Sequence, residues 1–149
     1  MGVVWIRISV LAAIFAVVAA VSLTRLEQAP GKPVATKYGA TSQGRAFALK
    51  LDADKTPVAF DTALSALCPM GRTISMPWSP VAGDGVRFNR DGDRLKVAEW
   101  GDGWRLELDG RVSDGGALRG TMSLVVNVRP KTQAAFDCRS PKVRVSAGR

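Results

Sequence analysis

The sequence predicts an all-β protein, an antiparallel sandwich or flattened barrel rich in β-meanders, that follows an N-terminal hydrophobic helix. Three observations support this fold class. Apolar and polar residues alternate with a period of two from Gly44 onward, and glycine–aspartate turn signals recur at short intervals, as at 83–85 and 101–103. The segment from Val3 to Leu23 is almost wholly apolar. Period-two alternation is typical of strands with one buried face, and short strands separated by frequent turns indicate a sandwich or barrel.

The N-terminal segment, residues 1–23, has two interpretations that both export the rest of the chain. In the first, Arg7 ends a short positive region, Ile8 to Val18 is the hydrophobic stretch, and small residues around Ala20 allow cleavage as a signal peptide. In the second, Val3 to Leu23 stays as a transmembrane anchor, because about 20 apolar residues span a bilayer. A buried helix of a soluble domain is disfavoured because the segment has no polar face.

A linker is predicted for residues 24–37, where Pro30, Gly31 and Pro33 interrupt any regular element. The exported β-domain is predicted to cover residues 38–149. Its localisation is therefore either secreted or anchored on the outer side of the cytoplasmic membrane.

Three rows of alternating apolar residues predict the first strands of the domain, at 47–51, 58–68 and 74–78. After them, the dipeptide Asp91-Gly92 is a strong signal for a two-residue hairpin turn. Such a turn pairs Arg90 with Asp93 and brings apolar residues of the two strands onto one face.

The next turn lies around residues 101–103, and the length of its loop decides the register. A four-residue loop that pairs Glu99 with Trp104 is preferred to a three-residue loop, because it matches apolar residues on one face and opposite charges on the other. The opposite charges that this register pairs are Lys96 with Glu107 and Arg94 with Asp109.

The meander continues through residues 104–112 and returns through 118–128. Gly110 and Gly120 are predicted to lie opposite each other, at a bend or at the close approach of another strand. A last hairpin is predicted around residues 139–142, between short apolar rows at 136–138 and 143–145.

The two cysteines of the chain, Cys68 and Cys138, are predicted to form a disulfide bond. An exported domain matures in an oxidising compartment, where two cysteines usually pair. A redox-active pair is disfavoured because the sequence has no Cys-x-x-Cys spacing.

The opening of the domain, Tyr38-Gly39-Ala40-Thr41-Ser42-Gln43-Gly44, resembles the Tyr-Gly-x-Thr-Ser-Gln-Gly motif of small exported proteins of actinobacteria. The resemblance covers residues 38–147 and includes the two cysteines, although Pro141 stands where that family has a glycine after the hairpin serine. It implies an exported all-β domain with an early and a late cysteine. The family has no assigned activity, so the resemblance implies no mechanism.

Composition excludes several classes of chemistry. The chain has no histidine, which removes histidine-dependent catalytic triads and histidine-ligated metal sites. We expect no cofactor and no metal, because the sequence has no phosphate loop, nucleophile elbow or calcium-loop spacing. The net charge is +8, yet neither the compartment nor any motif favours nucleic acid.

Trp100, with Lys96 and Arg105, is the candidate ligand-binding group. In the preferred register Trp100 lies at the start of a loop on the face of Lys96, where an exposed indole beside a cation can stack on a sugar or bind a protein. The alternative is that Trp100 covers the open end of the core.

These observations predict a non-enzymatic binding module, exported or membrane-tethered, whose partner is an anionic cell-envelope polymer or a surface protein. Membrane contact is expected through residues 3–23 if they are not cleaved. One alternative is a glycan hydrolase that uses the carboxylates of Glu99, Asp102 and Glu107. Another is a structural surface protein that self-associates through an exposed sheet edge.

Overall fold

The computed structural model describes residues 31–83 and 85–149, and this part of the chain is all-β, as predicted. The predicted leader at 1–23, and the linker up to residue 30, lie outside the described residues. The strands are β1 (Ala35–Thr41), β2 (Ala46–Leu51), β3 (Pro57–Leu67), β4 (Thr73–Trp78), β5 (Val86–Asp91), β6 (Arg94–Gly101), β7 (Trp104–Val112), β8 (Leu118–Val128), β9 (Phe136–Arg139) and β10 (Val143–Ala147). A short 3₁₀ turn, η1 (Pro69–Gly71), connects β3 to β4.

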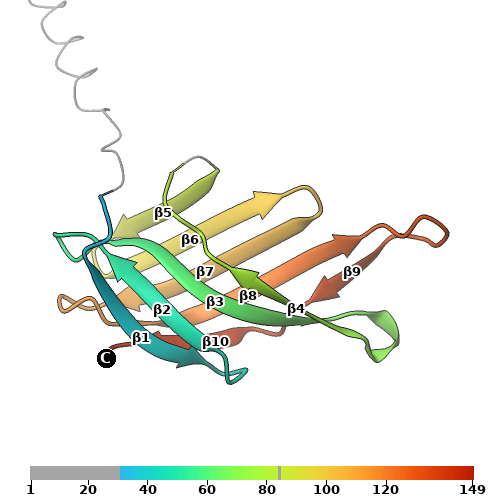
Figure 1. The fold of residues 1–149 in the computed structure, drawn as a ribbon, viewed down its shortest axis with the longest axis horizontal. Helices are drawn as coiled ribbons and strands as arrows, with labels where there is room; N and C mark the ends of the chain where they lie inside the picture. The colour runs from blue at the N-terminus through green and yellow to red at the C-terminus, as the bar shows by residue number, and fades with distance from the viewer. Residues whose placement is uncertain (1–30, 84) are drawn as a thin grey trace, which may run out of the picture.

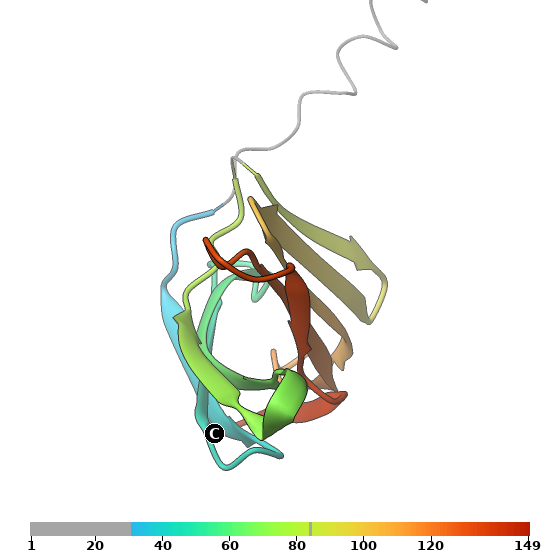
Figure 2. The same ribbon diagram turned by 90° about the vertical axis from the view of Figure 1, so that its right-hand side faces the viewer.

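Two layers of antiparallel strands face each other (Figures 1 and 2). One layer consists of β1 to β4 and the other of β5 to β8. The strands β9 and β10 both pair with β8; β10 continues to β1, and β9 touches the end of β3. These pairings close a ring of six strands, β1, β2, β3, β9, β8 and β10. Outside the ring, β4 pairs with β3, and β7, β6 and β5 extend the sheet from β8.

The core lies between the two layers and is built by the alternating apolar rows. The inward residues are more buried than their neighbours along a strand, as on β7, where Leu106 and Leu108 are each 1% exposed. Phe47 of β2 stacks on Phe60 of β3, with ring centroids 5.3 Å apart, and Phe60 contacts Phe88 of the other layer. The period of two in the sequence therefore identifies the inward faces correctly.

The registers of the two middle hairpins differ from the predicted ones by two residues. The first turn is Gly92-Asp93, so Asp91 pairs with Arg94; the second is Asp102-Gly103, so Gly101 pairs with Trp104. Gly92 has φ 59° and Gly103 φ 81°, a backbone region open to glycine at little cost. A shift of two residues leaves every side chain on its predicted face.

Packing explains the shorter second loop. The Trp104 indole lies over Gly101, where an added Cβ would be 2.5 Å from its ring nitrogen. The predicted four-residue loop leaves Gly101 in the turn and loses this contact.

The predicted last hairpin is wrong, because β9 and β10 do not pair with each other. Both run antiparallel to β8, one after the other along the same edge. Ser140 holds the chain there: its N–H donates to the Leu124 carbonyl at 2.8 Å, and its Oγ accepts from the Leu124 N–H at 2.8 Å. The segment from 140 to 142 is therefore an interruption in one edge and not a reversal.

The predicted pairing of Gly110 with Gly120 is confirmed on β7 and β8. A Cβ on Gly120 would be 2.6 Å from the Asp109 carbonyl oxygen and 2.7 Å from the Gly110 Cα. Gly120 also pairs with Val145 of β10, so backbones on both sides approach it closely.

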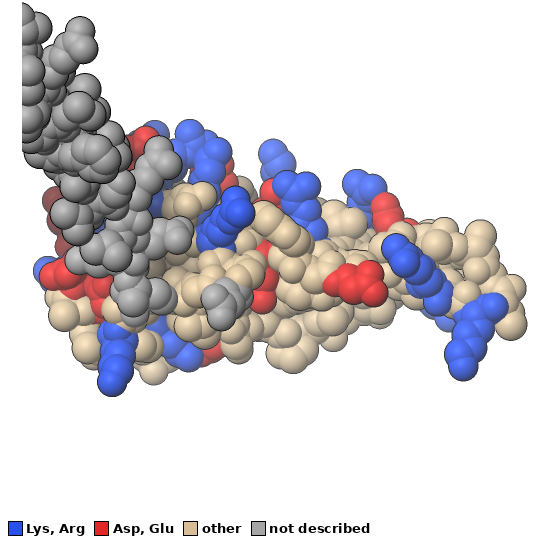
Figure 3. Space-filling model, turned by 90° about the horizontal axis from the view of Figure 1, so that it is seen from above, with Lys and Arg blue, Asp and Glu red and all other residues tan. Residues whose placement is uncertain are grey.

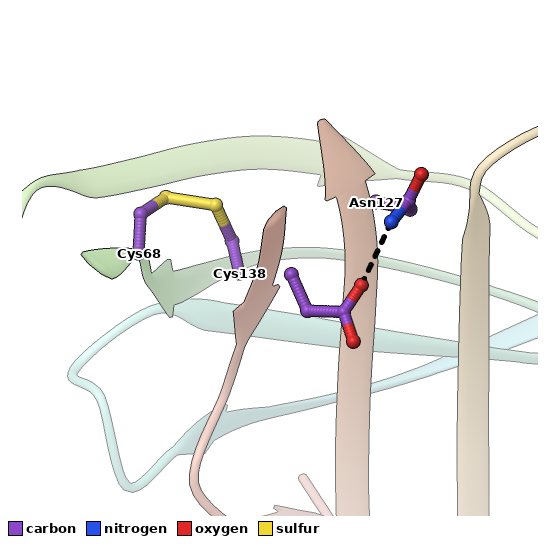
Figure 4. The surroundings of a disulfide bond; sticks show 4 residues. Cys68, Asn127 and Cys138 are labelled. Carbon is purple, nitrogen blue, oxygen red and sulfur yellow. Dashed lines mark hydrogen bonds between the residues drawn. A yellow bond between two sulfur atoms is a disulfide. The ribbon is translucent and has the colours of Figure 1, made fainter. Parts of the chain in front are cut away.

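The disulfide between Cys68 and Cys138 is present and joins the end of β3 to β9 (Figure 4). It lies at the weakest junction of the ring, where β3 and β9 share one residue pair, Leu67 with Arg139. On the other side of β9, the Asn127 side-chain amide donates to Asp137 Oδ1 at 2.9 Å. Within residues 31–83 and 85–149, no helix is long and apolar enough to span a bilayer.

Candidate functional site

A groove of about 400 Å³ lies on the outer face of the sheet formed by β5 to β8. It crosses the strands, from Arg87 and Asn89 on β5 to Lys142 in the segment between β9 and β10. Its volume is in the range of small-molecule sites, about 300–1,000 Å³. The full set of lining residues is Arg87, Asn89, Lys96, Val97, Ala98, Trp100, Glu107, Leu108, Asp109, Thr121, Met122, Ser123 and Lys142.

Side-chain size explains the hollow. Small side chains line part of the groove, namely Ala98, Thr121 and Ser123, which are outward-facing residues of β6 and β8. Longer side chains line the rest, including Lys96 and Trp100 on β6. Because alternate residues of neighbouring strands share a face, the sequence of each strand places these groups on the outer side.

The two groove carboxylates are already bound to arginines. Arg94 Nη2 lies 2.9 Å from Asp109 Oδ2, and the Arg94 hydrogen bond holds the pKa of Asp109 below its ordinary value. Glu107 accepts from the guanidinium of Arg105 on its own strand. Both acids therefore line the groove as hydrogen-bond acceptors that are held in place by a cation.

The groove also has cations that form no close ion pair within the described residues, although Lys96 lies opposite Asp109 and its charge helps to lower the pKa of that carboxyl. Within the described residues, no carboxylate oxygen lies within 4 Å of Arg87, Lys96 or Lys142. Figure 3 shows Lys and Arg side chains projecting in a row from the upper side of the view, which is the outer side of this sheet. The groove is consequently a polar surface with excess positive charge.

The predicted ligand-binding residues all lie on this outer face. Trp100 is 52% exposed and lines the groove together with Lys96. Arg105 pairs directly with Trp100 across β6 and β7, beside the groove. The guanidinium carbon of Arg87 lies 5.8 Å from the centre of the Trp100 ring, a cation–π distance. Trp100 thus does not cover the end of the core.

The predicted acid cluster is not brought together. Glu99 lies on the core side of β6, two residues from the buried Val97 and opposite the buried Leu106, while Glu107 lies on the outer face. Burial raises the pKa of Glu99 above its ordinary value. Asp102 is in the exposed β6–β7 turn. Glu99 and Glu107 therefore cannot act on one substrate from the same side of the sheet.

Sequence reasoning missed the contact of Arg87 with the Trp100 ring and the position of Lys142. The position of Arg87 could have indicated this contact. Arg87 lies two residues before Asn89 on the outward face of β5, and β5 pairs with β6, the strand that contains Trp100. Lys142 had no local signal, because it was assigned to the tip of a hairpin that does not form. Only the path of β9 and β10 along β8 brings it to the end of the groove.

Comparison of the chain with protein-family models, curated proteins and solved structures gives no match. The class of protein is therefore defined by its own architecture. It is a disulfide-linked antiparallel β-domain with a basic, tryptophan-flanked groove on the outer face of one sheet.

Proposed function

We propose that this chain is an exported, non-enzymatic binding module that holds an anionic polymer of the cell envelope in the outer groove. One observation carries this proposal: Arg87, Lys96 and Lys142 line the groove with no carboxylate oxygen within 4 Å among the described residues, beside the exposed Trp100. Free cations favour an anion by Coulomb attraction, and an exposed indole supplies apolar contact area for a sugar ring.

The polar floor favours a glycan over a simple polyanion. The hydroxyls of Thr121 and Ser123 can donate and accept hydrogen bonds, and the carboxylate oxygens of Glu107 and Asp109 can accept from sugar hydroxyls. Because Arg94 and Arg105 hold those carboxylates, they are preorganised as acceptors. An anionic polysaccharide uses both the cations and the acceptors of this groove.

Hydrolysis is a weaker interpretation of the same groove. Glycoside hydrolysis needs one carboxyl group with a raised pKa to protonate the leaving oxygen. In the groove, Asp109 has a lowered pKa and Glu107 is bonded to Arg105, while Glu99, whose pKa is raised, lies on the core side. Binding without cleavage agrees better with this distribution.

The disulfide supports the exported compartment of the proposal. Disulfides persist in oxidising environments and are rare in the cytoplasm. The bond between Cys68 and Cys138 is consistent with such an environment, and export agrees with the apolar segment of the sequence at 3–23.

A binding titration with polygalacturonate, a polyanionic polysaccharide, tests this proposal. Neutral dextran is the control for the charge, and polyglutamate is the control for the sugar. We expect Trp100→Ala to weaken polygalacturonate binding about tenfold, the size of an interface hot-spot effect of about 1.4 kcal/mol. The double variant Lys96→Gln with Lys142→Gln should weaken binding and reduce its salt dependence.

Matched variants elsewhere on the surface control for these changes. Tyr38→Ala removes an aromatic ring that is 62% exposed on β1, and Arg72→Gln removes an exposed cation between β3 and β4. Both should bind polygalacturonate like the wild type. Equal binding by Trp100→Ala and the wild type, or equal affinity for polyglutamate, would overturn the glycan assignment.

A further inference from the structure

The strand β5 has a free edge with unused backbone groups. It pairs with β6 on one side. On the other side, among residues 31–83 and 85–149, only Val86 has a backbone partner, since its N–H and C=O exchange hydrogen bonds with Gly83 at 3.1 and 3.4 Å. The groups of Val86 therefore point away from β6. Because backbone groups alternate direction along a strand, those of Phe88 and Arg90 also point away from β6. These two residues present unpaired donors and acceptors at the sheet edge.

The sequence of β5 is complementary to itself in one antiparallel register. If Asn89 lies opposite Asn89 of a second copy, Arg87 of each chain lies opposite Asp91 of the other. Phe88 then lies opposite Arg90, and these are the two residues with free backbone groups. The register thus supplies two ion pairs on the outer face. It also supplies backbone hydrogen bonds at Phe88 and Arg90, whose backbone groups point away from β6.

We propose that two copies of this chain pair antiparallel through β5, about a two-fold axis at Asn89. The pairing extends the β5–β8 sheet into one continuous sheet of two molecules. It is isologous, so it closes at a dimer and leaves no second β5 edge for further growth.

The other free edge is less suitable. The strand β4 contains Pro77, which lacks an N–H to donate. Its sequence, Thr73 to Trp78, has no charged residue that could pair across a two-fold axis. The observations therefore favour β5 over β4 as the surface that meets the second copy.

The dimer also changes the proposed binding site, a consequence that rests on the proposed function. Arg87 and Asn89 form the β5 end of the groove, at the edge that the second copy covers. Paired residues share a face, so the two grooves lie on the same side of the joined sheet and meet at the axis. In this dimer Asp91 of the second copy pairs with Arg87, so Lys96 and Lys142 are the groove cations that stay available to the polymer. A long polymer chain can contact both grooves, which strengthens binding through effective concentration.

The contact is small, so the free dimer should be weak. A six-residue edge buries less than the roughly 1,200 Å² of stable complexes. We expect a dissociation constant above about 1 μM for the dimer without polymer. A polymer long enough to span both grooves should raise the dimer fraction.

Cysteine cross-linking tests the register. Residues opposite each other in a non-hydrogen-bonded antiparallel pair have Cα atoms about 4.5 Å apart, a separation that a disulfide can bridge. Asn89→Cys should therefore form an intermolecular disulfide under mild oxidation, since both natural cysteines are already paired. The matched control is Ser75→Cys, an exposed position on β4. Cross-linking of Ser75→Cys equal to or above that of Asn89→Cys would overturn the proposal.

Charge reversal tests the ion pairs, with the oligomeric state measured by sedimentation velocity. Arg87→Asp places two acids opposite each other, and Asp91→Arg places two arginines opposite each other. Each single variant should weaken the dimer about tenfold, and the double variant should recover wild-type association. Failure of the double variant to recover, with all proteins folded, contradicts the register.

The dimer and the proposed polymer binding can be disproved independently of each other. A chain that stays monomeric at millimolar concentration, with and without polygalacturonate, overturns the dimer even if the monomer binds the polymer. A dimer that forms without polymer and binds none of it leaves this inference intact and contradicts the proposed function.

Discussion

At the scale of single residues, the position of a side chain on one face of a strand decides its chemistry. Glu99 and Trp100 are neighbours in the sequence, yet Glu99 lies toward the core and Trp100 toward the groove. Burial raises the pKa of Glu99, so the folded protein favours its protonated form. Trp100, more than half exposed, is free to contact a ligand.

We predict that Glu99→Gln stabilises the protein at pH 7. The folded-state pKa of Glu99 is above its unfolded value, so stability decreases as the pH rises from the unfolded pKa through the folded one. At pH 7 the wild type carries the full cost of a partly buried charge, which glutamine removes. Urea unfolding at pH 7 should show a higher midpoint for the variant, and the difference should shrink toward pH 4.

The matched control is Glu107→Gln on the outer face, which loses an ion pair with Arg105 and gains nothing from burial. It should not raise the midpoint. If the Glu99→Gln variant is less stable than the wild type at pH 7, the claim that the fold disfavours the charged Glu99 carboxylate is wrong.

At the scale of elements, β8 is the strand that connects β7, β9 and β10. It pairs with β7 along one edge and with β10 and then β9 along the other. Gly120 lies where β7 and β10 both approach, so its lack of a side chain permits two pairings at once. The period-two alternation of apolar residues predicts β8 itself. The sharing of its second edge between β9 and β10 depends on Ser140.

We predict that Gly120→Ala destabilises the protein by about 1–3 kcal/mol, the usual cost of overpacking. Its Cβ would be 2.6 Å from a backbone oxygen, which a rotamer change cannot relieve. Gly115→Ala is the control, because the nearest atom to its added Cβ would be Ser113 Oγ at 3.8 Å. Urea unfolding of both variants measures the difference. Equal stability of the two would show that β7 and β8 separate easily at this point.

At the scale of the whole molecule, the ring of strands is closed by one covalent bond and several ladders. The junction of β3 with β9 has a single residue pair, and the disulfide is attached at the same place. The loop that it closes spans 70 residues. In the chain-entropy model such a cross-link stabilises by about 4 kcal/mol.

We predict that the double variant Cys68→Ala with Cys138→Ala loses about 4 kcal/mol of unfolding free energy. Small domains have about 5–15 kcal/mol in total, so the variant should be close to unfolding at 37 °C. Urea unfolding of the variant, and of the wild type with and without reductant, provides the measurement. An unchanged midpoint on reduction of the wild type would contradict a structural role for this bond.

The sequence alone determined the fold class, the inward and outward faces of the strands and the disulfide partners. Each of these follows from local rules, since side chains alternate along a strand and an exported chain oxidises its cysteines. The sequence left open whether Trp100 faces a ligand or covers the open end of the core, and the exposure of its side chain comes from the structure. The resemblance to exported actinobacterial proteins and the export of the domain stay predictions.

Only the tertiary structure decided the two hairpin registers, the path of β9 and β10, and the assembly of the groove. Both register errors were of two residues, a shift that keeps every face and is therefore invisible to hydrophobic alternation. The groove brings together Arg87 and Lys142, which are 55 positions apart in the sequence, through hydrogen bonds between strands. The choice among registers depends on packing, such as the Trp104 indole over Gly101, and that packing exists only once the strands have met.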